Sequence, residues 1–225
     1  MTAAVLVASA VSRHFGDGAT LVTPVAGIDL ELSAGEFVLL TGPSGSGKST
    51  LLHLLTGFDT CDSGTVEWTG VPTGSSPSWS VVSIVPQSLG LLGELTIAEN
   101  IEMALILGGC PEDEAEARTA ATMHELALDH LGTRLPAETS LGQQQRAAVA
   151  RALAIRPSVL LADEPTSHQD EANGDLVMTA LRRCVDEGAA CLVASHDPRL
   201  VSIADRRLEL LDGRFIGSSA PVPSN

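Results

Sequence analysis

The stretch from residue 42 to residue 49 constrains the fold more than any other part of the chain. It fits the pattern GxxxxGKS/T and reads Gly42-Pro43-Ser44-Gly45-Ser46-Gly47-Lys48-Ser49. Residues 36–40 before it are β-prone, and a helix is expected from Lys48 to about residue 55, ending near Gly57. A glycine-rich loop between a strand and a helix predicts an α/β fold with an anion at the helix N-terminus. An ordinary glycine-serine turn would need neither this eight-residue frame nor this context.

Each residue type in this loop has a role in binding phosphate. Glycines let the backbone curl so that its N–H groups point inward around phosphate oxygens. Lys48 is expected to reach β- and γ-phosphates, and the Ser49 hydroxyl can bind Mg²⁺. The residues that we expect to contact a bound nucleotide here are Gly42, Pro43, Ser44, Gly45, Ser46, Gly47, Lys48, Ser49 and Thr50.

The net charge of −15 bears on the choice of partners. It argues against a broad nucleic-acid surface and against adhesion to anionic lipid through charge alone. No nucleic-acid partner is therefore expected. A polyanionic ligand remains compatible, because exposed charges beyond about 8 Å are screened at physiological salt, whereas loop contacts act at about 3 Å.

A second candidate site element is the acidic pair Asp163-Glu164, which follows the apolar residues 159–162. Ligands bind at the carboxyl ends of strands in open parallel sheets. An acid at this position can hold Mg²⁺, as phosphate-loop enzymes require. The neighbouring Glu164 points differently and can polarise an attacking water. Such a pair is common by itself, but together with the glycine loop it predicts a nucleotide-hydrolysing site.

Strand-like and helix-like segments alternate, which favours an α/β fold with a largely parallel sheet. Strands are expected at 5–11, 28–32, 36–40, 65–68, 81–85, 159–161 and 190–194. The character becomes helical from about residue 95 to 155 and again at 170–186, whereas 69–80 is loop-like and the tail 218–225 is expected to be disordered.

Capping signals divide the helical region. Thr96 with Glu99 forms a capping box, and Pro111 suits the first turn of the next helix. Residues 123, 126 and 127 are expected on one buried face of that helix, and Ser140 can cap a further helix.

With these residues in view, the sequence resembles the ATP-binding cassette (ABC) family from Phe15 to about Gly213. The segment Ser140-Leu141-Gly142-Gln143-Gln144-Gln145-Arg146 resembles the family signature, LSGGQQQR. Residues 35–59 and 160–167 resemble the branch of transporters for lipoprotein release and macrolide export.

The resemblance implies a role for each matching residue. Gln87 would reach Mg²⁺ and the attacking water, Asp163 would bind Mg²⁺, and Glu164 would act as the base. His196 would reach the γ-phosphate, and Asp170 would belong to the D-loop. Further nucleotide contacts are implied for Ser140, Gly142, Gln143 and Phe15. Phe15 would lie on the adenine ring, although an ordinary core position remains a close alternative.

The implied fold is a phosphate-loop core with a parallel sheet, an N-terminal antiparallel β region and an inserted helical subdomain. A single domain is expected over 1–225, with the helical subdomain at approximately 88–156.

Four positions depart from the family pattern, and one of them is Thr139, which stands where the signature has its first leucine. Leu141 replaces the first glycine of the signature, which bears on backbone geometry rather than on chemistry. His168 and Gln169 stand in the D-loop where small and apolar residues are usual, and these substitutions could alter communication across a dimer.

The family mechanism implies two kinds of partner. Two cassettes sandwich two ATP molecules, each between the phosphate loop of one subunit and the signature of the other, so a second ATP-binding subunit is expected, as a homodimer. A multi-span permease would contact residues 88–94. No apolar run is long enough to cross a bilayer and no signal peptide is expected, so the chain is placed in the cytoplasm, peripheral on the inner face of the membrane.

Other functions stay open at this stage. A non-transport ABC ATPase, acting as a membrane-associated regulator or mechanical coupler, has the same motifs. A nucleic-acid-handling relative would need large insertions, coiled-coil arms or zinc modules, and none fits here.

Overall fold

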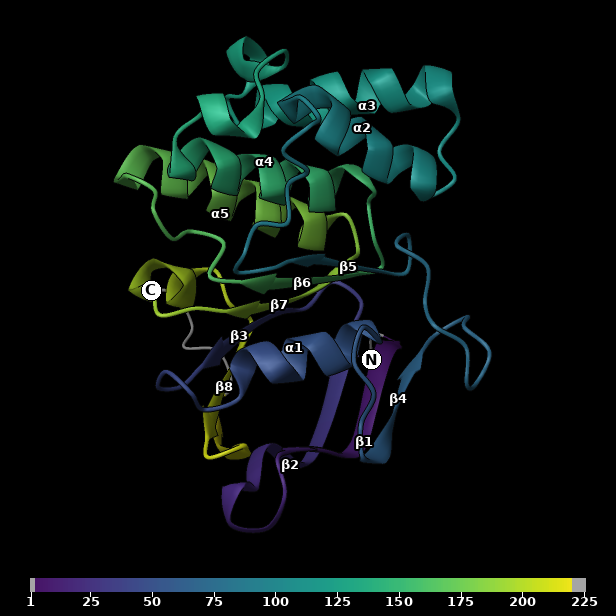
Figure 1. Cartoon of the computed structure of the whole chain (residues 1–225), viewed down its shortest axis with the longest axis vertical. Helices are drawn as coiled ribbons and strands as arrows, with labels where there is room; N and C mark the ends of the chain where they lie inside the picture. The colour runs from purple at the N-terminus through teal and green to yellow at the C-terminus, as the bar shows by residue number, and fades with distance from the viewer. Residues whose placement is uncertain (1–2, 220–225) are drawn as a thin grey trace.

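A six-stranded sheet forms the centre of the protein (Figure 1), in a computed structural model that describes residues 3–219. Five strands are parallel, and the last runs antiparallel to its neighbour. Their spatial order is β5 (Val82–Val85), β6 (Val159–Asp163), β7 (Ala190–Ala194), β3 (Phe37–Thr41), β8 (Arg206–Leu211) and β9 (Arg214–Ser219).

The buried strands of this sheet separate two hydrophobic cores. In β3, Phe37 and Leu39 pack into one core, and Val38 and Leu40 pack into the other. This follows from the two-residue period of a strand, which sends alternate side chains to opposite faces. Strands buried on both faces read as continuous apolar runs, which explains why these segments could be predicted.

One face of the sheet is covered by α1 (Lys48–Thr56) and a second, antiparallel sheet. That sheet has the order β2 (Val22–Ser33), β1 (Ala4–Phe15) and β4 (Ser63–Trp68). Helix α1 ends at Gly57, whose left-handed φ of 75° suits a glycine C-cap. The expected antiparallel β region near the N-terminus is therefore confirmed.

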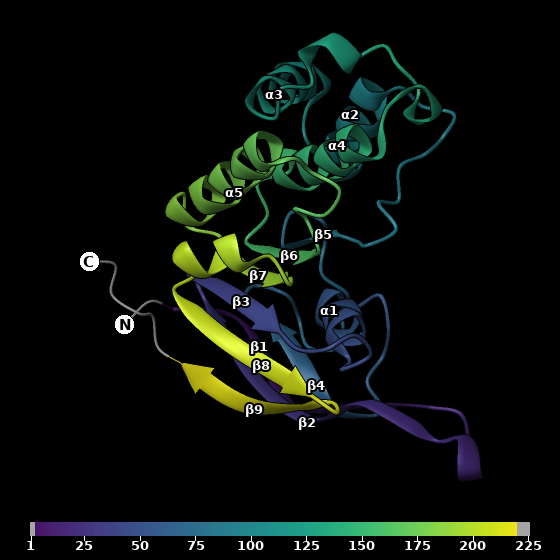
Figure 2. The ribbon, with the colours of Figure 1, turned by 90° about the vertical axis from the view of Figure 1, so that its left-hand side faces the viewer.

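Helices cover the other face in two tiers (Figures 1 and 2). The tier nearer the sheet holds α4 (Leu141–Ala154) and α5 (Glu171–Asp186), and the outer tier holds α2 (Ile97–Leu107) and α3 (Glu112–Glu125). Helices α2 to α4 are inserted between β5 and β6, which are neighbours in the sheet. Short 3₁₀ turns lie at Gly18–Thr20, Asp129–Leu131, Pro136–Glu138 and Pro198–Ser202. Over residues 3–219, no helix combines the length and apolar character needed to span a membrane.

Side-chain caps begin three of the helices. The Thr96 hydroxyl accepts a hydrogen bond from the Glu99 N–H, and Ser140 accepts one from Gln143 in the same way. Asp170 lies at the N-cap of α5 and accepts from Asn173. The expected capping box at Thr96 and the expected cap at Ser140 are both confirmed.

Several expectations about local structure were wrong. Pro111 is the N-cap of α3 rather than part of its first turn, and Ala127 lies beyond the end of that helix, exposed and with a left-handed φ of 52°. Ser218 and Ser219 belong to β9 rather than to a disordered tail, and 220–225 lie outside the described residues.

Candidate nucleotide-binding and hydrolysis site

The glycine loop joins β3 to α1 and has a backbone that only glycine can follow at two points. Gly47 has φ 106°, and a Cβ there would lie 1.8 Å from the carbonyl oxygen of Pro24. Gly42 has φ 150°, and a Cβ there would lie 2.1 Å from the carbonyl oxygen of Leu210. Strands β2 and β8 therefore pack directly against the loop and fix its shape.

Lys48 folds over this loop. Its side chain is almost fully buried, and Nζ donates to the carbonyl oxygens of Gly42 at 2.7 Å and Pro43 at 3.1 Å. The Ser46 hydroxyl is also buried and has no hydrogen-bond partner within residues 3–219. A buried hydroxyl without a partner carries a desolvation cost. The loop thus offers an ammonium and an unused hydroxyl to an anion.

The expected magnesium ligands lie together at the end of the sheet. The Ser49 hydroxyl donates to Asp163 Oδ2 at 2.5 Å, and Gln87 follows β5 and lines the same cavity. A hydroxyl, a carboxylate and an amide oxygen are all hard oxygen ligands that suit Mg²⁺. The described residues contain no cluster of three acidic, histidine or cysteine side chains that could hold a metal. The set of Ser49, Asp163 and Gln87 still fits Mg²⁺, because this ion is usually held by one or two carboxylates together with substrate phosphates.

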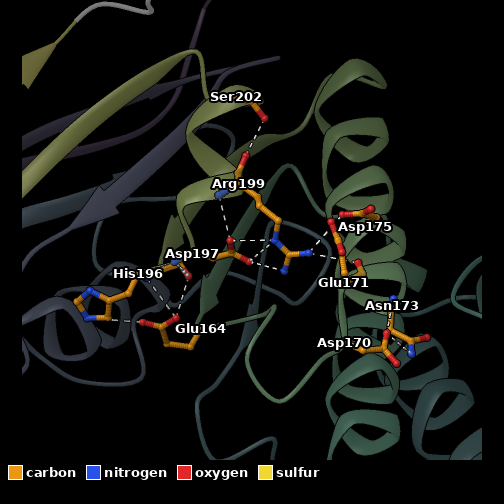
Figure 3. Close-up of polar contacts among 10 residues, drawn as sticks. Glu164, Asp170, Glu171, Asn173, Asp175, His196, Asp197, Arg199 and Ser202 are labelled. Carbon is orange, nitrogen blue, oxygen red and sulfur yellow. Dashed lines mark hydrogen bonds and ion pairs between the residues drawn. The ribbon is translucent and has the colours of Figure 1, made fainter.

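Glu164 directly follows Asp163, and its carboxylate points toward His196 (Figure 3). Its backbone is left-handed, with φ 51°, and its N–H donates to the carbonyl oxygen of Ala194 at 2.8 Å. The Ser195 hydroxyl donates to Glu164 Oε2 at 2.8 Å, and the His196 N–H approaches the same oxygen at 3.4 Å. The His196 ring Nε2 lies 3.8 Å from Oε1. The carboxylate is therefore held by residues that follow β7.

Sequence reasoning missed Ser195 as a contact of Glu164. Ser195 is fully buried, and its Oγ also accepts a hydrogen bond from the Asp197 N–H at 3.1 Å. The only signal in the sequence was its position directly before His196. Pro24 was missed as well, because its approach to the glycine loop joins distant parts of the chain.

An arginine anchors the segment that contains His196 (Figure 3). The Arg199 guanidinium donates to Asp197 Oδ2 at 2.7 Å, to Asp175 at 3.3 Å and to the carbonyl oxygen of Glu171 at 3.2 Å. The hydrogen bond from Arg199 to the Asp197 carboxylate holds the pKa of Asp197 below its ordinary value. The 3₁₀ turn after His196 is thereby tied to the first turns of α5.

One cavity of about 360 Å³ gathers most of the predicted residues. Its lining comes from the glycine loop, the two acids, the glutamine and the histidine: Ser44, Gly45, Gly47, Lys48, Ser49, Thr50, Gln87, Asp163, Glu164 and His196, with Pro24. Gly42 and Pro43 line an adjoining hollow with Ser195 and His196. The arrangement can hold a polyphosphate and place a carboxylate beside it.

The signature residues lie elsewhere. Among the described residues that line the cavity, none is Ser140, Gly142, Gln143 or Asp170. The first three begin α4 and the last begins α5, both in the helical tier. One chain therefore presents the phosphate loop and the signature as separate surfaces.

Phe15 is not a core residue. It lies at the end of β1 with 45% of its surface exposed, and the Arg13 guanidinium stacks over its ring at 4.9 Å. Arg13 is itself held by Asp59 and Asp62. The ring is therefore available to stack on a planar group, although it does not line the cavity.

A larger hollow of about 790 Å³ lies between α3 and the C-terminal ends of α4 and α5. Two of its arginines already have partners: Arg183 contacts Glu125, and Arg118 donates to the carbonyl oxygen of Ala154. We assign the chemistry to the smaller cavity because the phosphate loop and the acidic pair meet there.

Comparison with known proteins agrees with this geometry. Residues 25–167 match the model of the family described as ABC transporter. The lipoprotein-releasing system ATP-binding protein LolD of Gluconobacter oxydans (strain 621H) is 38% identical over 213 residues, which are 91% of this chain and 92% of LolD. The macrolide export ATP-binding/permease protein MacB of Mannheimia succiniciproducens is 35% identical over 219 residues, but this chain spans only 34% of its length.

A solved structure shows the same fold. The ATP-binding cassette MJ0796, in a dimeric post-hydrolysis state bound to ADP and Pi, superposes with a TM-score of 0.90 at 28% identity. The match covers 97% of this chain and all of that one. The resemblance to the lipoprotein-release and macrolide-export branch is confirmed by the relatives above. This chain therefore belongs to the ABC transporter family and is an ATP-binding cassette ATPase.

Proposed function

We propose that two copies of this cassette close around two Mg-ATP molecules and thereby drive a multi-span permease of the lipoprotein-release or macrolide-export type. The observation that carries the proposal is the separation of the two surfaces within one chain. The cavity holds the phosphate loop, the acids and His196, whereas Ser140 and Gly142 lie at the start of α4. A second cassette can supply the missing signature.

Each residue of the cavity has a proposed task. Lys48 would release the carbonyl oxygens of its own loop and bind β- and γ-phosphate oxygens instead. Ser49, Asp163 and Gln87 would hold Mg²⁺, which neutralises charge that develops on the phosphates.

The residues after the strands would act on water and on the γ-phosphate. Glu164, held by Ser195, would accept a proton from the attacking water, and His196 would contact the γ-phosphate. Phe15 would stack on adenine, which its half-exposed ring allows. From the opposite subunit, Ser140, Gly142, Gln143 and Asp170 would approach the same nucleotide.

An exposed apolar area supports the permease contact. Phe58 and Trp79 are 66% and 40% exposed, and they border an apolar hollow of about 230 Å³ that also includes Gly90. Leu92, in the segment expected to meet the permease, is 43% exposed. Exposed apolar side chains gathered around a hollow, as Phe58 and Trp79 are, mark interaction sites. Cytoplasmic helices of a permease would cover this area and hold the cassette at the inner face of the membrane.

Co-purification from membranes tests the permease assignment. A tagged chain should bring down a multi-span membrane protein, and Leu92→Glu should abolish that recovery while the isolated cassette still hydrolyses ATP. Ile216→Glu is the matched control, since Ile216 is 56% exposed on β9, away from this area. Recovery of no multi-span protein, or equal recovery with Leu92→Glu, would contradict the proposal and would favour a regulator or mechanical coupler.

A further inference from the structure

Gln169 makes two hydrogen bonds that join the D-loop to the signature turn of the same chain. Its Nε2 donates to the carbonyl oxygen of Gly142 at 2.7 Å, and its Oε1 accepts from Arg146 Nη1 at 3.0 Å. Gln169 stands directly before Asp170, the N-cap of α5, and Gly142 lies in the first turn of α4. One half-buried side chain thus connects the beginnings of two helices.

Arg146 fixes the orientation of this amide. Its side chain is buried, and its Nε donates to the carbonyl oxygen of Leu126 at 3.1 Å. Among residues 3–219, no carboxylate forms an ion pair with Arg146. A guanidinium can only donate, so the amide oxygen must face it and the NH₂ group must face Gly142. The assignment of the two amide ends is therefore dictated by the neighbours.

The backbones of the two segments also touch. A Cβ at Gly142 would lie 2.7 Å from the carbonyl oxygen of His168, so the D-loop leaves no room for a side chain there. His168 itself has a left-handed φ of 59°. An apolar residue at position 169 could keep this packing, but it could not donate to Gly142 or accept from Arg146.

We propose that Gln169 is a positioning residue that locks the signature turn to the D-loop, so that each cassette presents both segments to the opposite nucleotide as one unit. The inference rests on the dimer closure of the proposed function. It assigns a purpose to a D-loop residue that departs from the family pattern. Gly142 is only half-buried, so loss of the amide should mainly loosen the signature turn relative to the D-loop and thereby weaken closure of the dimer.

Two substitutions at position 169 separate the two hydrogen bonds. Gln169→Leu removes both, whereas Gln169→Glu can still accept from Arg146 but cannot donate to Gly142. All chains carry Glu164→Gln, which is expected to slow hydrolysis and hold the closed dimer. Analytical ultracentrifugation in Mg-ATP gives the dimer dissociation constant. Nucleotide titration at dilutions that keep the chain monomeric gives the affinity of the phosphate loop.

Both variants should raise the dimer dissociation constant about tenfold, the equivalent of about 1.4 kcal/mol, with unchanged ATP affinity of the monomer. Gln169→Glu should also keep its melting temperature through the Arg146 contact. The control is Thr69→Val, which removes a side-chain donor to the carbonyl oxygen of Ala4 in the antiparallel sheet and should leave dimerisation unchanged.

Three results would overturn the inference. Gln169→Glu could dimerise as well as the reference chain, which would remove the Gly142 contact from the mechanism. Both variants could lose monomer ATP affinity in the same proportion, which would indicate general damage. The reference Glu164→Gln chain could stay monomeric in Mg-ATP; dimer closure itself would then fail, and the inference would fall with it.

Discussion

Removal of the Ser195 hydroxyl should slow hydrolysis without weakening nucleotide binding. Ser195 Oγ donates to Glu164 Oε2 at 2.8 Å, and Ser195 is fully buried. A hydrogen bond to a charged group contributes about 1.5–3 kcal/mol. Each 1.36 kcal/mol changes a rate tenfold, so Ser195→Ala should lower kcat by roughly 10- to 100-fold. The roughly 100-fold loss of kcat is expected if the His196 N–H, at 3.4 Å from Glu164 Oε2, cannot hold the Glu164 carboxylate alone.

Steady-state phosphate release at saturating Mg-ATP measures this effect. KM should change little, because Ser195 does not line the cavity that holds the phosphate loop and the acids. Ser195→Thr keeps a hydroxyl and should recover part of the rate. Ser78→Ala, at an exposed serine bonded to Ser80, should behave as the native chain. An unchanged kcat for Ser195→Ala, or a loss confined to KM, would refute the positioning of Glu164 by Ser195.

Three further predictions concern the loop and the thiols. Lys48 is the only lysine and lines the open cavity, so an amine reagent should modify Lys48 and the N-terminus at most. Modification of Lys48 should inactivate the enzyme and ATP should shield it; equal labelling with and without ATP in peptide mass spectra would remove Lys48 from the mechanism. Gly47→Ala should abolish ATP binding in calorimetry because its Cβ would overlap a carbonyl oxygen of β2, whereas Gly45→Ala, with nothing within 4 Å, should bind more weakly but measurably; equal binding by both would contradict the close approach. Burial raises the pKa of Cys184 from 9.0 to about 11 and that of Cys191 well above 9.0, so both thiols should resist alkylation at pH 8 until the chain unfolds. Above about pH 9 the thiols of the unfolded chain ionise first, so the free energy of unfolding should fall by up to about 1.4 kcal/mol per pH unit for each thiol. Denaturant titrations with no such slope would contradict this burial.

The parts of the site that the sequence predicted are those with local signals. The spacing of glycines in residues 42–49 predicts the backbone of the loop, and the pair Asp163-Glu164 lies at the end of a continuous apolar run. The contacts that orient these groups join residues far apart in the chain. Ser195 reaches Glu164 across 31 positions, and Gln169 reaches Gly142 across 27. No periodicity or spacing in a single sequence records such pairs.

The hairpin of β8 and β9 was missed although a signal was present. Leu208 and Leu210 are buried, whereas Arg207 and Glu209, which precede them, are exposed. Such alternation is typical of a strand with one wet face, and an Asp-Gly pair at 212–213 is a strong hairpin signal. The charged residues obscured the strand, because they lie on its exposed side.

The length of α3 was misjudged for a different reason. Residues 123, 126 and 127 have helical spacing, but the helix ends at Glu125 and the chain turns through a left-handed residue. Leu126 still packs into the core from outside the helix. Tertiary packing therefore buries Leu126 although the helix ends before it.

The dependence of specific activity on protein concentration tests the shared site most directly. If each nucleotide needs the phosphate loop of one cassette and the signature of another, ATPase activity per chain should rise with concentration and then reach a plateau. Ser140→Arg should keep ATP binding by the monomer but remain inactive at every concentration, because the bulky side chain blocks closure. Activity per chain that stays flat down to nanomolar protein, or normal turnover by Ser140→Arg, would contradict the shared-site mechanism.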